Sequence, residues 1–556
     1  MRFLCLFVAV VTLAVSPAAL AQPADVIYHS GNIYTMDPVR PRAEAVAMWG
    51  SRIAAVGSDA EVLEFAGPFT QRVDLQGRTV LPGLIDSHGH MFGLGLFGLG
   101  RIDLSRAGGL DEVIRTVRAK ADTAVAGEWI LGGRWDHESW PSKTLPRHEE
   151  LSAATPEHPV WLRRVDGHAG LANAAAMRLA GITAETPSPA GGEIIKDARG
   201  QPTGVLVDNA MSLIERVITT ASHDPREVIL KAQEMCLSVG LTGVHDAGVS
   251  PAEIEVYRKL EAQGLLKIRV YAMVSAPYAM RWFTENGPTA GDRLTVRSAK
   301  LYVDGAMGSR GAWLLEPYAD RPVDSEGKAY AGLAVMEPER IQEIAEHALS
   351  FGYQVCTHAI GDRGNREVLD AYARALARFP NDDHRFRIEH VQLLHLADIP
   401  RFAAMGVIPS MQPTHCTSDM RWVEARVGAE RAKGAYAWAS LLRTGARIAG
   451  GSDFPVESHN PFLGLFAAVA RQDLSQSPPE GWLPSERMTR EEALRSMTLD
   501  AARASFDEDQ RGVLRAGMLA DFIVIDRDVM TCEARAIADA QVQMTVIGGE
   551  VVYKRR

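Results

Sequence analysis

The stretch from Leu81 to Met91 reads Leu-Pro-Gly-Leu-Ile-Asp-Ser-His-Gly-His-Met. An apolar run that ends in His-x-His is typical of a buried strand whose last residues emerge into a site, because side chains at i and i+2 share one strand face. His88 and His90 would then point the same way, about 6 to 7 Å apart, and could bind one metal ion. Gly89 between them leaves room for close approach of backbone or ligand. His-x-His also occurs by chance, so its meaning depends on the other ligands that the chain supplies.

The composition is that of an ordinary globular protein with enough material for a large core. The chain has 556 residues, of which 46% are hydrophobic and 23% are charged. Lys and Arg number 59 against 69 acidic residues. Because no basic block stands out, nucleic acid and anionic membranes are disfavoured as partners.

The first 21 residues have the pattern of a secretory signal peptide. Arg2 supplies a positive charge, Phe3 to Val15 form a nearly continuous apolar run, and Ala19-Leu20-Ala21 is a cleavage site of the A-x-A type. The apolar run is shorter than the roughly 20 residues of a membrane-spanning helix, which disfavours a retained anchor. We therefore expect a periplasmic or secreted mature protein with no stable membrane insertion.

The mature chain would keep four cysteines, namely Cys236, Cys356, Cys416 and Cys532. They are far apart and lack C-x-x-C spacing, which argues against a zinc ribbon or a redox motif. An oxidising compartment would permit disulfides, and the spacing leaves open whether any form.

The two ends of the chain share a pattern of short strands and turns. Residues 25–80 alternate short apolar runs with Gly-containing turns, and Ala520 to Asp526 and Met544 to Tyr553 repeat this pattern. Isolated short strands are marginally stable. We therefore expect residues 22–80 and 510–556 to pair into one small β-sandwich.

Between these ends, residues 81–509 alternate strands with amphipathic helices. Pro338 to Phe351 and Arg366 to Arg378 carry apolar residues at helical spacing. With the opening strand, the strand-like runs number about eight, the others being Val160 to Leu162, Thr242 to His245, Ala299 to Val303, Tyr353 to Thr357, Phe386 to Ile388, Val407 to Met411 and Arg447 to Ala449. Eight parallel strands close an α/β fold of the (β/α)8 TIM-like kind. A doubly wound open sheet is the alternative, but no glycine-rich phosphate fingerprint follows the first strand.

The segment from about Gly127 to Ile218 is rich in Pro, Gly and Trp and is less regular. We interpret it as an elaborated barrel segment that could cap a site. Its side chains Trp135, Trp140 and Trp161 could line an apolar pocket, although core packing is the default role of such aromatics.

Residue types that bind metals or carry protons stand at the expected carboxyl ends of the strands, where barrel enzymes place their chemistry. They are His88, His90, His168, His245, Asp246, Asp304, His358, His390, His415 and Asp453, together with Lys300. Four histidines, one aspartate and a lysine are the ligand set of a binuclear metal hydrolase. Nitrogen and carboxylate ligands suit zinc, and manganese, iron or nickel fit the same chemistry.

The chain resembles the amidohydrolase superfamily over nearly all of its mature length. The resemblance lies in Pro82 to His90, Lys300, His358, His390, Gly451-Ser452-Asp453 and the region from Gly512 to Asp526. The phrases His358-Ala359-Ile360-Gly361-Asp362 and Arg387-Ile388-Glu389-His390 are similar to the amidohydrolase-3 type branch that includes N-substituted formamide deformylases. The resemblance implies a metal-binding barrel beside a β-sandwich built from both chain ends.

The resemblance also implies a role for each matching position. His88, His90 and Asp453 would hold one divalent ion, and His358 and His390 would hold the second. Lys300 matches the position that many members carboxylate on the amine with CO2, which turns a cation into a carbamate that bridges two ions. The alternative is a surface or salt-bridged lysine, and without the modification the site could hold a single ion.

The implied activity is hydrolysis of a non-peptide carbon-nitrogen bond in an amide, formamide or N-acyl small molecule. Metal binding lowers the pKa of a water to roughly 7, so hydroxide attacks the polarised carbonyl and Asp453 passes the proton to the departing nitrogen. A catalytically silent metal- or solute-binding envelope protein is one alternative. A deaminase is another, disfavoured because Ala-Ile-Gly-Asp follows His358 without the His-x-x-Glu arrangement of adenosine-type deaminases. The substrate itself and a homo-oligomeric state stay open.

Residues close to these strand ends are candidates for contact with the substrate. His168 could orient the substrate or stabilise its oxyanion, or it could be a core histidine. Asp362 and Arg363 follow His358 closely and could bind substrate, with a salt-bridged loop as the equal alternative. Cys356 shares a strand face with His358 and is expected in the barrel interior.

Overall fold

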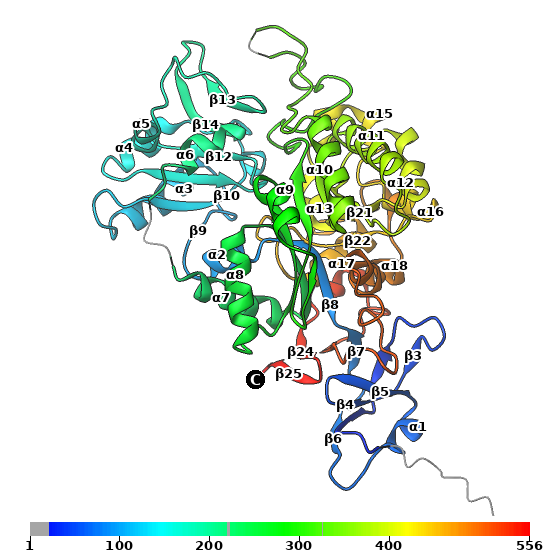
Figure 1. The fold of residues 1–556 in the computed structure, drawn as a ribbon. Coiled ribbons are helices and arrows are strands. Elements are labelled where there is room, and N and C mark those ends of the chain that lie inside the picture. The colour runs from blue at the N-terminus through cyan, green and yellow to red at the C-terminus, as the bar shows by residue number, and fades with distance from the viewer. Residues whose placement is uncertain (1–21, 220–222, 325) are drawn as a thin grey trace, which may run out of the picture.

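The computed structural model describes residues 22–219, 223–324 and 326–556. Figure 1 shows a central barrel, an inserted lobe beside it, and a β-sandwich below it to which both ends of the described chain contribute. The expected signal peptide, residues 1–21, lies outside the described residues. Among the described helices, none has the length and apolar character needed to cross a bilayer.

Eight parallel strands form the barrel. Around the sheet they are β8 (Leu84–Gly89), β15 (Leu241–Val249), β16 (Arg269–Ser275), β18 (Leu294–Tyr302), β19 (Gln354–Ala359), β20 (Arg387–His390), β21 (Ile408–Met411) and β22 (Ala449–Gly450), with the short β17 (Thr289–Ala290) paired to β18. Between β22 and β8, the Asp453 N–H donates to the His88 carbonyl at 2.7 Å and the His90 N–H to the Phe454 carbonyl at 2.8 Å. The predicted barrel fold is confirmed.

Helices cover the outside of the barrel with their apolar faces turned inward. They are α7 (Pro225–Ser238), α8 (Pro251–Ala262), α9 (Ala276–Glu285), α10 (Pro338–Phe351), α11 (Asp362–Arg378), α12 (Ile399–Met405), α16 (Trp438–Arg443), α17 (Pro461–Ala470), α18 (Arg490–Ser496) and α19 (Leu499–Ala504). α10 has the predicted bounds, and α11 begins earlier than predicted because extended backbone ends at Gly361. Three short helices, α13 (Pro413–Asp419), α14 (Val423–Val427) and α15 (Ala429–Ala432), follow β21.

One of the eight strands predicted for the barrel was assigned wrongly. Val160 to Leu162 lie in β11 (Val160–Arg164), which belongs to the inserted lobe, and the remaining barrel position is filled by β16. Both segments are short buried apolar runs, so they have the same residue pattern. Only the partner strands distinguish them, and those partners are distant in sequence.

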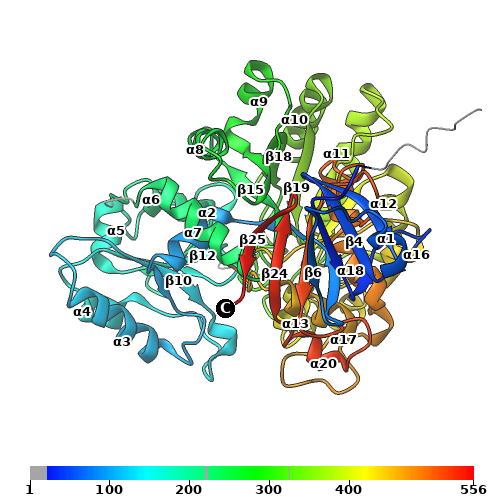
Figure 2. The same cartoon turned by 90° about the horizontal axis from the view of Figure 1, so that it is seen from below.

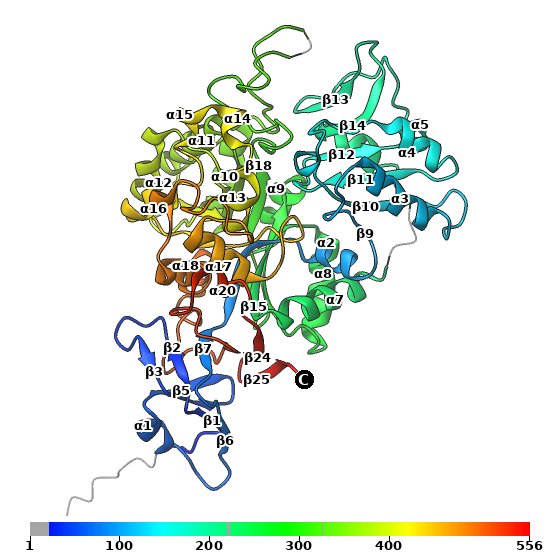
Figure 3. The same cartoon turned by 180° about the vertical axis from the view of Figure 1, so that it is seen from behind.

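The inserted lobe, defined as residues 102–218, has a six-stranded sheet of its own. Its strands are β9 (Ile102–Asp103), β10 (Ile130–Trp135), β11, β12 (Ala169–Ala172), β13 (Gly192–Lys196) and β14 (Pro202–Asp208), flanked by α3 (Leu110–Ala121), α4 (His148–Ala154), α5 (Ala174–Ala180) and α6 (Ser212–Glu215). Because β9 pairs with β10, the lobe's sheet begins at Ile102, earlier than the expected boundary near Gly127. Trp135 and Trp140 are buried in the core of the lobe. Figure 3 shows the lobe beside the barrel, with helix α2 (Met91–Gly98) on the side of the barrel that faces the lobe.

The sandwich packs two sheets, and the strands of the larger one come from both chain ends (Figure 2). One sheet holds β5 (Arg52–Gly57), β4 (Ala45–Trp49), β1 (Val26–His29) and β6 (Gln71–Asp74), with α1 (Asp59–Leu63) beside it. The other holds β25 (Glu550–Lys554), β24 (Val542–Ile547), β23 (Phe522–Ile525), β7 (Thr79–Pro82), β2 (Asn32–Tyr34) and β3 (Arg42–Ala43), and α20 (Ala534–Ile537) connects β23 to β24. β7 continues through Gly83 into β8, so the sandwich leads directly into the first strand of the barrel.

Candidate metal centre

The carboxyl ends of the barrel strands bring together all six residues predicted as ligands: His88, His90, Lys300, His358, His390 and Asp453. His88 Nε2 lies 3.2 Å from Lys300 Nζ and 3.7 Å from Asp453 Oδ1. His90 Nε2 lies 3.0 Å from Asp453 Oδ1. The ring centroids of His358 and His390 are 4.4 Å apart, and those of His88 and His390 are 4.8 Å apart.

Three of these histidines are oriented by hydrogen bonds from Nδ1 to acceptors outside the centre. The pairs are His88 with Glu389 Oε2 at 2.5 Å, His90 with the Ala247 carbonyl at 2.9 Å, and His390 with Gln412 Oε1 at 2.9 Å. An Nδ1–H that donates outward leaves Nε2 as an unprotonated acceptor, which is the form that binds a metal ion. His358 is turned the other way, because its Nε2 lies 3.5 Å from the Gly305 carbonyl and Nδ1 is the nitrogen left over.

Asp453 and Lys300 complete a donor set that fits a divalent ion. Ligand atoms of His88, His90 and Asp453 lie within 4.8 Å of one another. Asp453 Oδ1 is buried and receives no well-aligned hydrogen bond from the described residues. A buried carboxylate oxygen without a donor is expected where a cation binds. Lys300 is 1% exposed, and no carboxylate of the described residues lies within ion-pairing distance of its amine.

Burial and neighbouring charges set the protonation of the centre. Burial, reinforced by Lys300, lowers the pKa of His88 to about 4, and burial also holds the pKa values of His358 and His390 well below their ordinary value. Burial opposes the ionisation of Asp453, but the hydrogen bond from His415 and the contact with His90 hold its pKa well below the usual range. At neutral pH, His88, His358 and His390 are therefore neutral imidazoles and Asp453 is a carboxylate.

Beneath the centre, Glu389 is held by a buried arginine. Arg387 Nε lies 2.8 Å from Glu389 Oε1, and both side chains are fully buried. Burial opposes the charge on Glu389, but Arg387 and His88 lower its pKa to about 2. Glu389 therefore stays ionised and keeps accepting the proton of His88 Nδ1.

His415 also belongs to this centre, although its place in the sequence indicated no specific role for it. It lies in α13, with Nε2 3.3 Å from Asp453 Oδ2 and Nδ1 3.7 Å from Glu457 Oε1. Burial opposes its protonation, but the two carboxylates raise its pKa to about 9. Ligand atoms of His390, His415 and Asp453 form a second close triad. Its signal in the sequence was its position just after the end of a barrel strand.

His168 was expected at the end of a barrel strand. It lies instead in the inserted lobe, from which its side chain reaches the centre. Its ring centroid lies 4.7 Å from that of His358. Its Nδ1 lies 2.7 Å from Asp208 Oδ1, and Asp208 holds a positive φ of 48° at the end of β14. The lobe thus supplies one side chain of the site and the carboxylate that orients it.

Asp362 and Arg363 do not belong to the described residues that line the cavity. Asp362 is buried and accepts a hydrogen bond from the Leu315 N–H at 2.9 Å. Arg363 lies 3.6 Å from Glu367 and 4.4 Å from the centre of the Trp313 ring. Cys356 is fully buried in the barrel, and the four described cysteines are unpaired.

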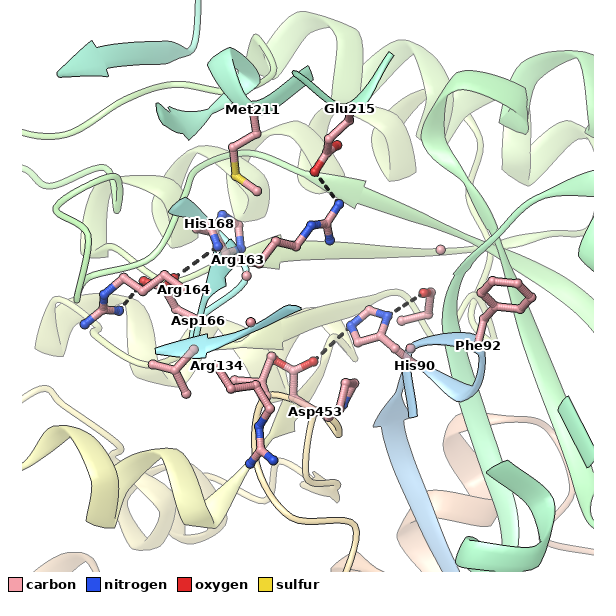
Figure 4. Close-up of a pocket in the computed structure, with 18 of the residues that line it drawn as sticks. His90, Phe92, Arg134, Arg163, Arg164, Asp166, His168, Met211, Glu215 and Asp453 are labelled. Atoms are coloured by element: carbon pink, nitrogen blue, oxygen red, sulfur yellow. Dashed lines mark hydrogen bonds and ion pairs between the residues drawn. The ribbon is translucent and has the colours of Figure 1, made fainter. Parts of the chain in front are cut away.

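A cavity of about 810 Å³ opens above the centre between the barrel and the inserted lobe (Figure 4). In Figure 4, His90 and Asp453 lie on its barrel side, and Arg163, His168, Met211 and Glu215 reach it from the lobe. Its lining includes Lys300, His358 and His390. Trp161 lines it too, while Trp135 and Trp140 are core residues. The arrangement can hold a small molecule against a metal centre.

Comparison with known proteins agrees with this arrangement. A family model described as "Amidohydrolase family" matches residues 71–553. The chain is 35% identical to Protein LONG AFTER FAR-RED 3 of Arabidopsis thaliana, over 95% of this chain and 92% of that protein. It is 30% identical to N-substituted formamide deformylase of Arthrobacter pascens, over 96% of this chain and 99% of that protein. An uncharacterized metal-dependent hydrolase from Pyrococcus furiosus superposes with a TM-score of 0.71 at 30% identity, covering 91% of this chain and 100% of that one.

Proposed function

Because the chain belongs to the amidohydrolase family and resembles a solved metal-dependent hydrolase, we propose that it cleaves the carbon-nitrogen bond of a non-peptide amide, formamide or N-acyl amine. The observation that carries this proposal is the convergence of His88, His90, Lys300, His358, His390 and Asp453 at one end of the barrel. The relative named N-substituted formamide deformylase supports the choice of bond. Zinc is the proposed ion, since imidazole nitrogen and carboxylate oxygen are its usual ligands.

The proposed ligands divide into two groups. His88, His90 and Asp453 would hold one ion, and His358, His390 and a carboxylated Lys300 would hold the second. When bound, the metal supplies Lewis acidity toward the carbonyl oxygen and an activated water at neutral pH. Carboxylation suits Lys300 because a buried ammonium among imidazoles would repel the ions, whereas a carbamate would attract them.

The chain's own residues supply the proton transfer. Asp453 is held between His90 on one side and His415 on the other, at 3.0 and 3.3 Å. From that position it can take the proton of the nucleophile and deliver it to the departing nitrogen. His415, paired with Asp453 and Glu457, keeps the carboxylate oriented during the transfer.

His168 is the proposed partner of the substrate carbonyl. Burial opposes the protonation of His168, but Asp208 raises its pKa. The imidazolium form keeps Nδ1 bonded to Asp208 and carries a second N–H at Nε2, on the ring that lines the cavity. A donor placed there stabilises the negative charge that develops on the carbonyl oxygen. We also propose that the protein acts outside the cytoplasm, a proposal that rests on the leader-like pattern of residues 1–21.

The proposed function is tested with purified protein freed of metal by a chelator and reloaded with zinc. A panel of N-formyl and N-acyl amines is offered, and release of the free amine is measured. We expect release that depends on the added metal and disappears in Asp453→Asn. Hydrolysis by the metal-free protein, or metal uptake without turnover of any member, would contradict the proposal, and the second result would favour a binding protein.

A further inference from the structure

Helix α2 forms a wall that leads away from the metal centre. His90 is the residue just before this helix, and Arg101 follows its C-cap, Leu99. The 8 residues of α2 span about 12 Å at the rise of an α-helix. The cavity is lined by His90 at one end of α2 and by Arg101 at the other.

The side of α2 that lines the cavity is apolar, consisting of Phe92, Gly93, Leu96 and Phe97. The opposite side packs tightly on α7, where a Cβ at Gly95 would lie 2.0 Å from the Val228 carbonyl oxygen. From the lobe, the cavity is lined by Leu131, Trp161, Met211 and Ile218. Apolar walls on both sides favour an apolar substituent on the substrate.

At the far end of α2, the cavity carries a net positive charge. Arg163 forms an ion pair with Glu215, so these two charges offset each other. Arg101 lines the same region, and its side chain has no hydrogen bond or ion pair with the described residues. Burial and the nearby Arg163 lower the pKa of Arg101 to about 10, so its guanidinium remains charged at neutral pH.

The last carbonyls of α2 do not bind the Arg101 guanidinium. Arginines near a helix C-terminus often bond to its last carbonyls. Here the Gly95, Leu96 and Phe97 carbonyls accept backbone N–H groups of Leu99, Arg101 and Gly100 instead. A half-buried cation without a partner is unfavourable, and an anionic ligand would remove that cost.

We propose that the substrate of this site carries an apolar substituent that ends in an anionic group, in the simplest case a carboxylate, and that Arg101 binds that group. The scissile amide then lies at the metal centre, one length of α2 away. A guanidinium suits this task because it binds a carboxylate through two parallel hydrogen bonds. The inference rests on the proposed function, since it describes the remainder of the molecule whose amide is cleaved.

A kinetic comparison tests this specificity. The substrates are N-formyl ω-amino acids of graded chain length and their terminal carboxamides. We expect the parent to prefer the carboxylate by at least about tenfold in kcat/KM at the best length, which is the weight of one charge-assisted contact. Arg101→Gln should lose this preference with the carboxamide rate unchanged, while Arg101→Lys keeps part of it. No preference in the parent, or an unchanged preference in Arg101→Gln, would overturn the inference.

The matched control is Arg115→Gln, which removes the same charge from an exposed arginine of α3. It should keep the carboxylate preference of the parent, and loss of the preference there would overturn the inference by showing a general charge effect. Calorimetry separates the inference from the proposed function, since it needs no turnover. Straight-chain monocarboxylates should bind the parent at least about tenfold more tightly than they bind Arg101→Gln. The matching primary amides should bind both proteins equally. If the parent and Arg101→Gln bind the carboxylates equally, the inference is overturned even if amides are hydrolysed. If the parent binds them more tightly but hydrolyses no amide, the inference is supported and the proposed function is rejected.

Discussion

The Asp453 N–H donates a hydrogen bond to the His88 carbonyl at 2.7 Å and thereby joins the last strand end of the barrel to the first. The side chains of the same two residues face each other across the proposed metal site, with His88 Nε2 3.7 Å from Asp453 Oδ1. This backbone contact therefore helps to close the barrel and sets the spacing of two proposed ligands.

Gly89→Ala should disturb this junction. A Cβ at Gly89 would lie 2.5 Å from the ring of Phe454, the residue after Asp453. We expect a loss of about 1–3 kcal/mol in the free energy of unfolding, because the buried ring must move, and weaker metal retention in dialysis. Gly109→Ala is the control, since no atom lies within 4 Å of its Cβ position. Parent-like stability and metal retention in Gly89→Ala would contradict this view of the junction.

Glu389→Gln should weaken metal binding, although it replaces none of the proposed ligands. Glu389 accepts the His88 Nδ1 proton at 2.5 Å and so fixes which nitrogen faces the centre. Loss of such an orienting carboxylate typically costs 10–100-fold in metal affinity. Competition with a chelator measures the change, and circular dichroism verifies the fold. The exposed Glu343→Gln serves as control, and a parent-like affinity in Glu389→Gln would show that this hydrogen bond does not orient the ligand.

Lys300→Met should reduce the amount of metal that the protein retains. The substitution keeps an unbranched side chain at a position that is 1% exposed, but it removes the amine that would be carboxylated. We expect the parent made with bicarbonate to hold two equivalents and the variant to hold one, as measured by elemental analysis. Equal metal content in both proteins would remove Lys300 from the ligand set.

Asp521 should make the joint between barrel and sandwich sensitive to acid. Its Oδ2 lies 2.7 Å from Arg269 Nε of β16. Burial opposes the charge on Asp521, but Arg269 holds its pKa below the ordinary value. Because the folded pKa is the lower one, the stabilisation is present above the unfolded pKa of about 3.9 and is lost as the pH falls through the folded pKa.

Asp521→Asn should therefore be less stable than the parent at neutral pH, by about 3–5 kcal/mol for a buried pair that loses one partner, and the difference should shrink in acid. Denaturant unfolding across this pH range measures it. The exposed pair of Arg281 and Glu285 provides the control through Glu285→Gln. If the difference in unfolding free energy between Asp521→Asn and the parent does not change with pH, the charge of the Asp521 carboxylate does not hold the barrel and the sandwich together.

Much of the fold was predictable because its signals are local. The apolar run before His88 and the helical spacing of α10 depend on neighbouring residues only. The choice between β11 and β16 as a barrel strand was not predictable in this way, since both are buried apolar runs and differ only in their distant partners.

The candidate site shows the same division. His88, His90, His358, His390 and Asp453 follow apolar runs, so their clustering was expected. His415 was visible at a strand end, but its role depends on a carboxylate that is distant in sequence, Asp453. Arg101 had no signal at all, because the absence of a partner for its guanidinium among the described residues is a property of the folded cavity.

We propose that one metal centre, which includes His88 and Asp453 at the closing junction of the barrel, performs the hydrolysis. The most direct measurement determines metal content and N-formyl amine hydrolysis side by side in the parent, His88→Ala and Asp453→Asn. We expect His88→Ala to lose bound metal and activity together, and Asp453→Asn to lose activity at least as strongly as it loses metal. Both variants binding metal and turning over substrate like the parent would contradict it.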